Sequence, residues 1–251
     1  MLSAGFLVQA APSYAAAPTT REAAGTSSNW AGYVATGATF SDVKGTWVQP
    51  AVSCTAGASY SSFWVGLGGY TATSSELEQI GTSSDCTSRN RVSNYAWYEL
   101  VPLPLTRVAL PIRAGDTMSA EVSVVGTAVT MTLTDVTTGQ TSTISQTVAT
   151  PDVTSAEWIA EAPSFCSQSS CRVLPLANFG SVAFSAASAT ANGGAASLAT
   201  ADSIQLVSRT GLNASPSALG ADGASFTVST AAPVLRPQRL NRWGWSWSFV
   251  H

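Results

Sequence analysis

Strict alternation of apolar and polar residues in short segments is the feature that most constrains this chain. In "AVTMTLTDVTTGQTSTISQTV" (128–148), Val129, Met131 and Leu133 alternate with threonines before "TTGQ" turns the chain. Alternation with period two is typical of an antiparallel strand that buries one face. Because no segment shows a sustained apolar stripe of period 3.6 with helix caps, we expect little helix.

Other short segments are rich in β-branched and aromatic residues and are bounded by Gly, Pro, Asn or Ser. They include "GTWVQP" (45–50), "SFWVGLGG" (62–69), "NYAWYELVP" (94–102), "TMSAEVSVVG" (117–126) and "FGSVAFSAASA" (179–189). No internal repeat supports a propeller. The sequence therefore predicts an all-β fold, a large antiparallel sandwich of two packed sheets.

The low content of charged residues limits which kinds of partner the protein can bind. Only 10% of the 251 residues are charged, the net charge is −3, and Lys44 is the sole lysine beside ten arginines. Nucleic-acid binding rests on clustered basic residues, so we expect no nucleic-acid partner. A surface poor in lysine and rich in Ser and Thr suits a secreted protein that tolerates acid, because few carboxylates change charge as the pH falls.

The ends of the chain differ from its middle. We interpret 1–17 as a truncated signal segment, because "SYAAA" could be cleaved although a basic start is missing. Residues 18–27 read as a linker or pro-segment remnant, 28–230 as the folded domain, and 231–251 as an Arg/Trp-rich tail. The tryptophans of that tail could form an edge strand, an exposed tail or a carbohydrate-stacking patch. No stretch reaches the roughly 20 apolar residues of a membrane span, so we expect no membrane partner.

Four cysteines allow three pairings. We interpret "CSQSSC" as a small disulfide loop, Cys166–Cys171, and Cys54–Cys86 as a longer cross-link; buried free thiols are the alternative. Disulfides would indicate an oxidising compartment. The spacing in "CSQSSC" resembles a zinc motif only superficially, because two further good ligands would be needed and no histidine is available for them.

Acid–base chemistry must proceed without imidazole, because the only histidine is the last residue, His251. This excludes Ser-His-Asp, Cys-His and HExxH arrangements. Carboxylates remain, and three lie beside aromatic residues: Glu99 in "AWYEL", and Glu157 and Glu161 in "AEWIAE". Such glutamates are commonly solvated on an outer sheet face, but an aromatic wall raises a carboxyl pKa toward the range useful for catalysis.

Strand geometry constrains these carboxylates. On a strand, Glu157 and Glu161 share one face about 13 Å apart, too far for a hydrogen-bonded pair. Each would therefore act with a partner from a neighbouring strand. In "NYAWYEL" (94–100), Trp97 and Glu99 share one face and Tyr98 lies on the other.

Eight segments, in order, resemble the glutamic peptidases, or eqolisins, and especially their bacterial members. They are "SSNWAGYV" (27–34), "VKGTWVQP" (43–50) after Phe40, "FWVGLGGY" (63–70), "EQIGT" (78–82), "YAWYELVP" (95–102), "VTTGQ" (136–140), "AEWIAEAP" (156–163) and "FGSVAFSAA" (179–187). The resemblance implies a bent, lectin-like sandwich with the active site on its concave face. It also implies polypeptide substrates and no cofactor or metal. We further expect a secreted monomer.

By this resemblance, Gln79 in "EQIG" and Glu157, the first glutamate of "AEW", form the catalytic pair. Glu157 would activate a water and then protonate the leaving amine, while the Gln79 amide stabilises the oxyanion. Glu161 would be a supporting residue or lie at the substrate edge. Candidates for the surrounding wall and the substrate contacts are Trp64, Gly68, Trp97, Tyr98, Glu99 and Glu161.

The chain departs from the family pattern at two acids. Gly68 stands where an aspartate usually follows "WVG-x", and Ser83 and Ser84 precede Asp85 where an earlier aspartate is common. The loss of an acid could shift the pKa of Glu157 and change the pH optimum. Two other functions stay open, a non-catalytic carbohydrate-binding sandwich and a glycosidase with carboxylates about 5–10 Å apart. The placement of Glu157 relative to Gln79 and Glu99 separates them.

Overall fold

A computed structural model describes residues 25–55, 57–71, 74–87, 91–167 and 170–231. The predicted leader, most of the linker and nearly all of the Arg/Trp-rich tail lie outside these residues. The described chain is built of strands, and one 3₁₀ turn, η1 (Leu198–Thr200), interrupts them. No helix in these described ranges is long and apolar enough to cross a membrane.

The strands are short and follow one another closely. The first nine are β1 (Gly25–Ser27), β2 (Trp30–Thr36), β3 (Phe40–Val48), β4 (Ser62–Gly68), β5 (Leu77–Cys86), β6 (Val92–Val101), β7 (Thr106–Val108), β8 (Thr117–Val125) and β9 (Ala128–Asp135). The rest are β10 (Gln140–Thr147), β11 (Ser155–Glu161), β12 (Ser164–Ser167), β13 (Ser170–Val173), β14 (Ser181–Ala191), β15 (Gly194–Ala196), β16 (Asp202–Ser208), β17 (Gly211–Pro216) and β18 (Phe226–Thr230).

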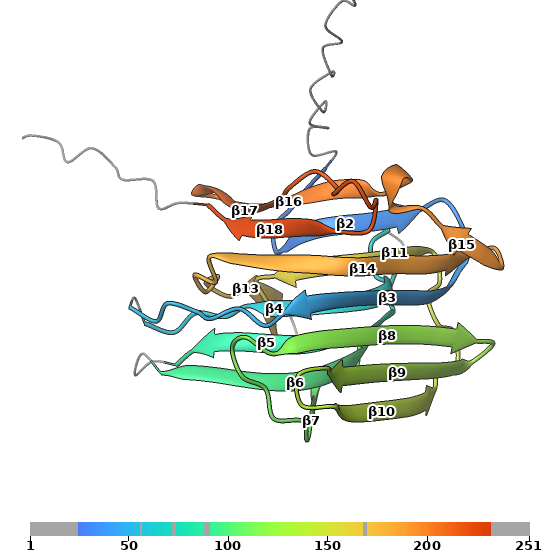
Figure 1. The fold of residues 1–251 in the computed structure, drawn as a ribbon, viewed down its shortest axis with the longest axis horizontal. Helices are drawn as coiled ribbons and strands as arrows, with labels where there is room; N and C mark the ends of the chain where they lie inside the picture. Colours follow the sequence, from blue (N-terminus) through green and yellow to red (C-terminus); the bar gives the residue numbers. More distant parts are fainter. Residues whose placement is uncertain (1–24, 56, 72–73, 88–90, 168–169, 232–251) are drawn as a thin grey trace, which may run out of the picture.

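The strands form two layers, as expected for a sandwich, but the layers are joined by hydrogen bonds into one sheet that folds over itself. Its order is β10-β9-β8-β3-β14-β18-β17-β16-β2-β11-β4-β5-β6-β7 (Figure 1). Strands β3 and β8 of one layer pack on β4, β5 and β11 of the other. Neighbours are antiparallel apart from β1, which lies parallel to β16. The all-β prediction is confirmed.

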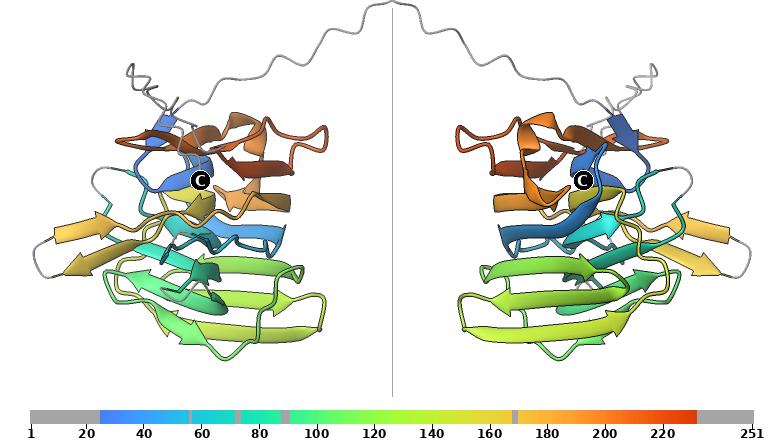
Figure 2. Two further views of the ribbon diagram at one scale, coloured as in Figure 1. Left: turned by 90° about the vertical axis from the view of Figure 1, so that its left-hand side faces the viewer. Right: turned by 90° about the vertical axis from the view of Figure 1, so that its right-hand side faces the viewer.

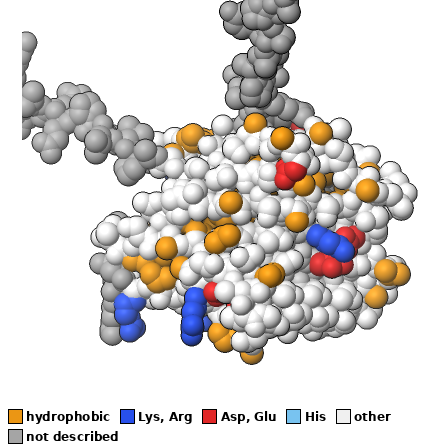
Figure 3. All heavy atoms as spheres, viewed as in Figure 1, with side chains coloured by type: hydrophobic (Ala, Val, Ile, Leu, Met, Phe, Trp, Pro, Cys, Tyr) orange, Lys and Arg blue, Asp and Glu red, His pale blue; other side chains and the backbone are white. Residues whose placement is uncertain are grey.

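The alternating segment 128–148 folds as the hairpin β9–β10. Val129, Met131 and Leu133 are fully buried between the layers. The threonines face outward, and across the hairpin the Thr134 hydroxyl lies 2.9 Å from that of Thr141. Few charged side chains are visible on the face shown in Figure 3, where hydrophobic atoms are scattered among uncharged ones. Period-two alternation thus identified both the strand and the face that it buries.

The main core lies between the layers and is rich in aromatic rings. Trp158, on β11, is completely buried, and its indole Nε1 donates a 2.6 Å hydrogen bond to the Lys44 carbonyl on β3. Gly45 makes room for this indole, because a Cβ at position 45 would lie 2.9 Å from Trp158 Cδ1. Since Trp158 follows Glu157 directly, this contact joins the strand of the predicted catalytic glutamate to the opposite layer.

A second, smaller apolar cluster covers the opposite face of the layer that contains β11. Its buried members are Val34, Trp64, Leu77, Trp97, Ile159 and Ile204. We call this surface the site face, because the side chains of Glu157 and Gln79 point to it by strand alternation.

Both predicted disulfides are present. Cys54–Cys86 links the segment after β3 to the end of β5, and Cys166–Cys171 closes the hairpin β12–β13. That hairpin forms a separate two-stranded sheet and projects from the sandwich (Figure 2). No cysteine is free.

Replacing Trp158 with alanine tests the link between the layers. We expect Trp158→Ala to lower the free energy of unfolding by about 3–5 kcal/mol, because it leaves a large cavity and an unpaired carbonyl. Denaturant unfolding measures this. The exposed Val125→Ala serves as a control and should change stability by less than about 0.5 kcal/mol. A loss equal to that of the control would contradict the role given to Trp158.

Candidate active site

The predicted catalytic residues lie in one row across three adjacent strands. Glu157 on β11 is paired with Gly66 on β4, and Gly66 is paired with Gln79 on β5. Gln79 is in turn paired with Glu99 on β6. Residues paired across strands point to the same face of a sheet. The register therefore brings Glu157, Gln79 and Glu99 together on the site face.

Gly66 separates the two catalytic candidates and contributes no side chain. A Cβ there would lie 3.0 Å from the Trp64 ring and 3.1 Å from the Glu78 carbonyl and the Leu77 side chain. With strands about 4.8 Å apart, the Cα atoms of Glu157 and Gln79 are about 10 Å apart. Glu157 and Gln79 therefore flank Gly66 on one face of the sheet, with no side chain between them at that position.

Gln79 is oriented by Glu99. Its Nε2 donates a 2.7 Å hydrogen bond to Glu99 Oε2, which leaves the second amide hydrogen available. Burial raises the pKa of Glu99, and the hydrogen bond from Gln79 opposes that rise. Glu99 therefore sets which way the glutamine amide faces.

Glu157 is fully buried. Burial raises its pKa well above the ordinary value, and the charges of Asp152 and Glu78 add to this. Desolvation penalises the charged form of a carboxyl, so this group takes up a proton more readily than a free glutamate. A carboxyl of this kind is suited to exchange protons with a substrate.

Unpartnered buried polar atoms concentrate here. Within the described residues, six buried side-chain N and O atoms have no hydrogen-bond partner. Five of them belong to side chains of the site face: both carboxyl oxygens of Glu157, Gln79 Oε1, Trp97 Nε1 and Ser155 Oγ. Such atoms are rare in folded proteins, and their gathering around one row marks a functional site.

Glu161 and Trp64 form a support beside this row. Trp64 Nε1 donates a 2.8 Å hydrogen bond to Glu161 Oε2, and Asn29 Nδ2 donates one of 2.9 Å to Oε1. Burial raises the pKa of Glu161 to about 7, against the effect of these bonds. Trp30 packs edge-on against Trp64. Both carboxyl oxygens of Glu161 are engaged by the scaffold, which fits a supporting residue.

The two other predicted wall residues, Trp97 and Tyr98, lie on opposite faces of the sheet. Trp97, 2% exposed, belongs to the site face two residues from Glu99. Tyr98 points the other way and packs against the main core, so the structure does not bring it to the site. The reason is strand alternation, which puts neighbours along β6 on opposite faces.

Gly68 ends β4 and lies against Asp152 from the loop before β11. Its φ is +84°, and a Cβ there would lie 2.5 Å from Asp152 Cβ. The Asp152 carboxylate accepts hydrogen bonds from Ser74 Oγ, the Gly69 amide and Thr154. Burial raises the pKa of Asp152, but the hydrogen bonds outweigh it and lower the pKa overall. Asp152 therefore lies next to Gly68, the position where the family pattern predicts an aspartate.

No role was predicted from the sequence for two acidic residues near the site, Asp152 and Glu78. Asp152 could have been noticed as the acid that precedes the strand of Glu157 within "PDVT", a pattern in which Asp caps the following turn. Glu78 adjoins Gln79 but points to the core side, where burial raises its pKa to about 7. Only the fold brings their charges near Glu157. No group of three or more potential metal ligands occurs among the described residues.

Comparison with solved structures identifies close counterparts of this fold. Scytalido-glutamic peptidase with a transition-state-analogue inhibitor is 27% identical with a TM-score of 0.72, covering 81% of this chain and 98% of that one. SCP-B, a member of the eqolisin family in complex with the tripeptide Ala-Ile-His, is 26% identical with a TM-score of 0.68 and the same coverage. Aspergilloglutamic peptidase from Aspergillus niger is 29% identical with a TM-score of 0.60, covering 69% and 99%.

The fold, with these matches, defines a glutamic endopeptidase. The model of the Peptidase A4 family matches residues 28–229, and the chain belongs to that family. Among curated protein sequences, none matches significantly. The resemblance read from the eight sequence segments is confirmed, and the substrates are polypeptides.

Replacing Glu78 with glutamine tests the electrostatics beneath the site. A carboxyl whose pKa is raised to about 7 stabilises the fold while protonated, and this contribution disappears as the pH rises from about 4.5 through 7. Glu78→Gln does not titrate. We expect its unfolding free energy to fall less over this range than that of the wild type, by about 2–3 kcal/mol. Denaturant titrations at both ends of the range measure this, and equal slopes would contradict it.

Proposed function

We propose that this glutamic endopeptidase cleaves peptide bonds with a water activated by Glu157 and Gln79. One observation carries the proposal: the two residues flank Gly66 on one face of the sheet, and both have buried oxygen atoms without a hydrogen-bond partner. A carboxylate in this position needs a hydrogen-bond donor, and a water between the two residues would supply it.

In the proposed reaction, ionised Glu157 removes a proton from the water, whose oxygen attacks the scissile carbonyl carbon. The Gln79 amide donates a hydrogen bond to the developing oxyanion, using the N–H that Glu99 leaves available. Glu157 then passes its proton to the leaving amine, and the C–N bond breaks. The raised pKa of Glu157 makes its carboxylate a stronger base for the first step, and the proton taken from the water there is the one delivered to the amine.

The same pKa sets the expected pH range. Glu157 must be ionised to act as a base, and its burial raises the pH at which this occurs. We therefore propose activity at mildly acidic rather than strongly acidic pH. The two disulfides support secretion into an oxidising environment, and we propose that the enzyme acts there as a monomer.

A glycosidase is less compatible with this arrangement. The Cα atoms of Glu157 and Glu99 are about 14 Å apart, because β4 and β5 lie between their strands. Gln79 lies between the two carboxyl groups and already bonds to Glu99. Glycosidases hold their carboxyls about 5–10 Å apart with the sugar between them.

Substitution of the pair tests the proposed mechanism. Glu157→Gln removes the base and should lower kcat by at least about 1,000-fold, and Gln79→Ala removes an oxyanion donor and should lower it by about 100- to 1,000-fold. Cleavage of a denatured protein across the acidic range measures both. Glu121→Gln, on the outer face of the opposite layer, is the matched control. Full activity of Glu157→Gln with an intact fold would rule the assignment out.

Replacing Asp152 tests the electrostatic coupling. Its negative charge raises the pKa of Glu157, so Asp152→Asn should lower that pKa. We then expect the acidic limb of the kcat/KM profile to move to lower pH. Asp42→Asn, on β3 of the other layer, should leave the limb in place. A limb that moves upward or stays fixed in Asp152→Asn would refute the coupling.

A further inference from the structure

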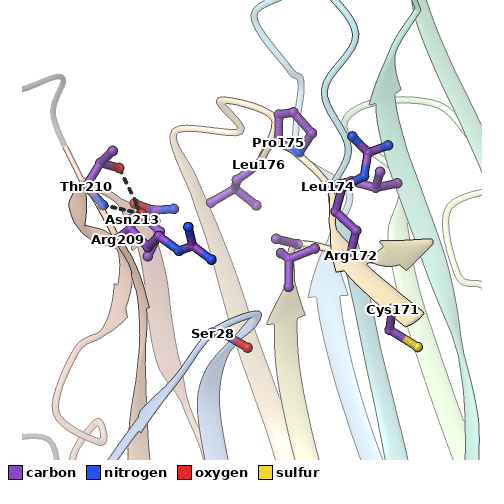
Figure 4. Close-up of a pocket in the computed structure, with 12 residues that line it drawn as sticks. Ser28, Cys171, Arg172, Leu174, Pro175, Leu176, Arg209, Thr210 and Asn213 are labelled. Atoms are coloured by element: carbon purple, nitrogen blue, oxygen red, sulfur yellow. Dashed lines mark hydrogen bonds between the residues drawn. The ribbon is translucent and has the colours of Figure 1, made fainter. Parts of the chain in front are cut away.

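A pocket of about 640 Å³ opens where β11 ends, between the hairpin β12–β13 and the turn that joins β16 to β17. Its apolar lining includes Ala162, Leu174 and Leu176. Arg172 and Arg209 stand on opposite walls, and the Arg209 side chain reaches toward the space between them (Figure 4). The pocket therefore combines an apolar surface with two exposed arginine side chains.

No carboxylate lines this pocket, so neither of its arginines has an acidic partner among the lining residues. Lys44 is paired with Asp42 and Glu121, and the Arg107 guanidinium lies 3.9 Å from the centre of the Tyr95 ring. The ion pairs found among the described residues involve Lys44 alone. In a chain of net charge −3, two arginines without a carboxylate partner make this pocket a local positive site.

The pocket lies at the end of β11, the strand that carries Glu157. Glu161 lies four residues beyond Glu157 on the site face and binds Asn29, while the adjoining residues Ala162 and Ser28 line the pocket. Five strand residues from Glu157 to Ala162 span about 16 Å. An extended polypeptide advances about 3.3–3.6 Å per residue, so a bound chain would reach the pocket about five residues from the scissile bond.

We propose that this pocket binds an aspartate or glutamate side chain of the polypeptide substrate, about five residues from the cleaved bond. Arg172 and Arg209 pair with the carboxylate, and the leucines contact its methylene groups and the neighbouring residues. An interior side chain is the expected occupant, because the substrate of an endopeptidase continues on both sides of the cleaved bond. This inference rests on the proposed function of the catalytic row.

Matched peptides test the proposal. We would prepare internally quenched peptides with one scissile core and place glutamate or glutamine at each position three to seven residues away on either side. At about pH 5.5 most glutamate is ionised. We expect glutamate at one position to raise kcat/KM by about 3- to 10-fold over glutamine in the wild type. High salt should weaken the preference.

The double variant Arg172→Gln/Arg209→Gln should lose this preference and cleave the glutamine peptide as the wild type does. Arg113→Gln, an exposed arginine outside the pocket, should keep the preference. Equal cleavage of both peptides at every position by the wild type would overturn the proposal. So would a preference that survives in the double variant, or one that disappears when the peptide C-terminus is amidated.

Cleavage of the glutamine peptide tests the proposed catalytic pair independently of the proposed pocket. If its cleavage requires Glu157 while no glutamate preference is found, the pocket assignment fails and the proposed function stands. If Glu157→Gln cleaves it at the wild-type rate, the proposed function fails regardless of the pocket.

Discussion

The register between β11, β4 and β5 is the constraint on which the site depends. It places Glu157, Gly66 and Gln79 in one row, with the glycine between the two functional side chains. A shift of one residue in either pairing would turn a catalytic candidate toward the core, because side chains alternate faces. The large core on the opposite face resists such a shift. Trp158, the neighbour of Glu157, is locked there against Gly45 and the Lys44 carbonyl. The packing that stabilises the sandwich therefore also holds the catalytic geometry.

Burial of carboxyl groups connects the chemistry to the stability of the fold. Desolvation is the largest cause of the raised pKa of Glu157, and it also raises the pKa of Glu78 and Glu161 to about 7. Each of these groups is easier to bury when protonated. A fold that encloses such groups with few balancing cations is best matched to acidic surroundings. The same low-dielectric environment raises the pKa of Glu157, the proposed proton carrier.

Asp152 supplies a negative charge beside the position where the family pattern predicts an aspartate. Gly68, with its positive φ, leaves the space that Asp152 fills from the adjoining loop. The carboxylate is held by Ser74, Thr154 and the Gly69 amide, so its charge is fixed near the end of β4. A comparison of β4 alone with the family pattern would show only that the aspartate expected at position 68 is absent. In space, a negative charge is still present, and it acts on Glu157.

Much of this protein follows from the sequence alone. Alternation in 128–148 determines the hairpin and its buried face, since side chains on a strand point alternately to the two sides. The absence of an internal histidine restricts the predicted chemistry to carboxyl and amide groups, and the ordered segments identify the family and predict its catalytic pair. Tertiary structure alone decided the rest. Cross-strand register brought Gln79 beside Glu99 and into one row with Glu157, and the folding of the whole sheet placed Asp152 against Gly68 and opened the pocket that Arg172 and Arg209 line. These contacts join residues far apart in the chain, and their distances depend on how the whole sheet folds over itself, which no local pattern encodes.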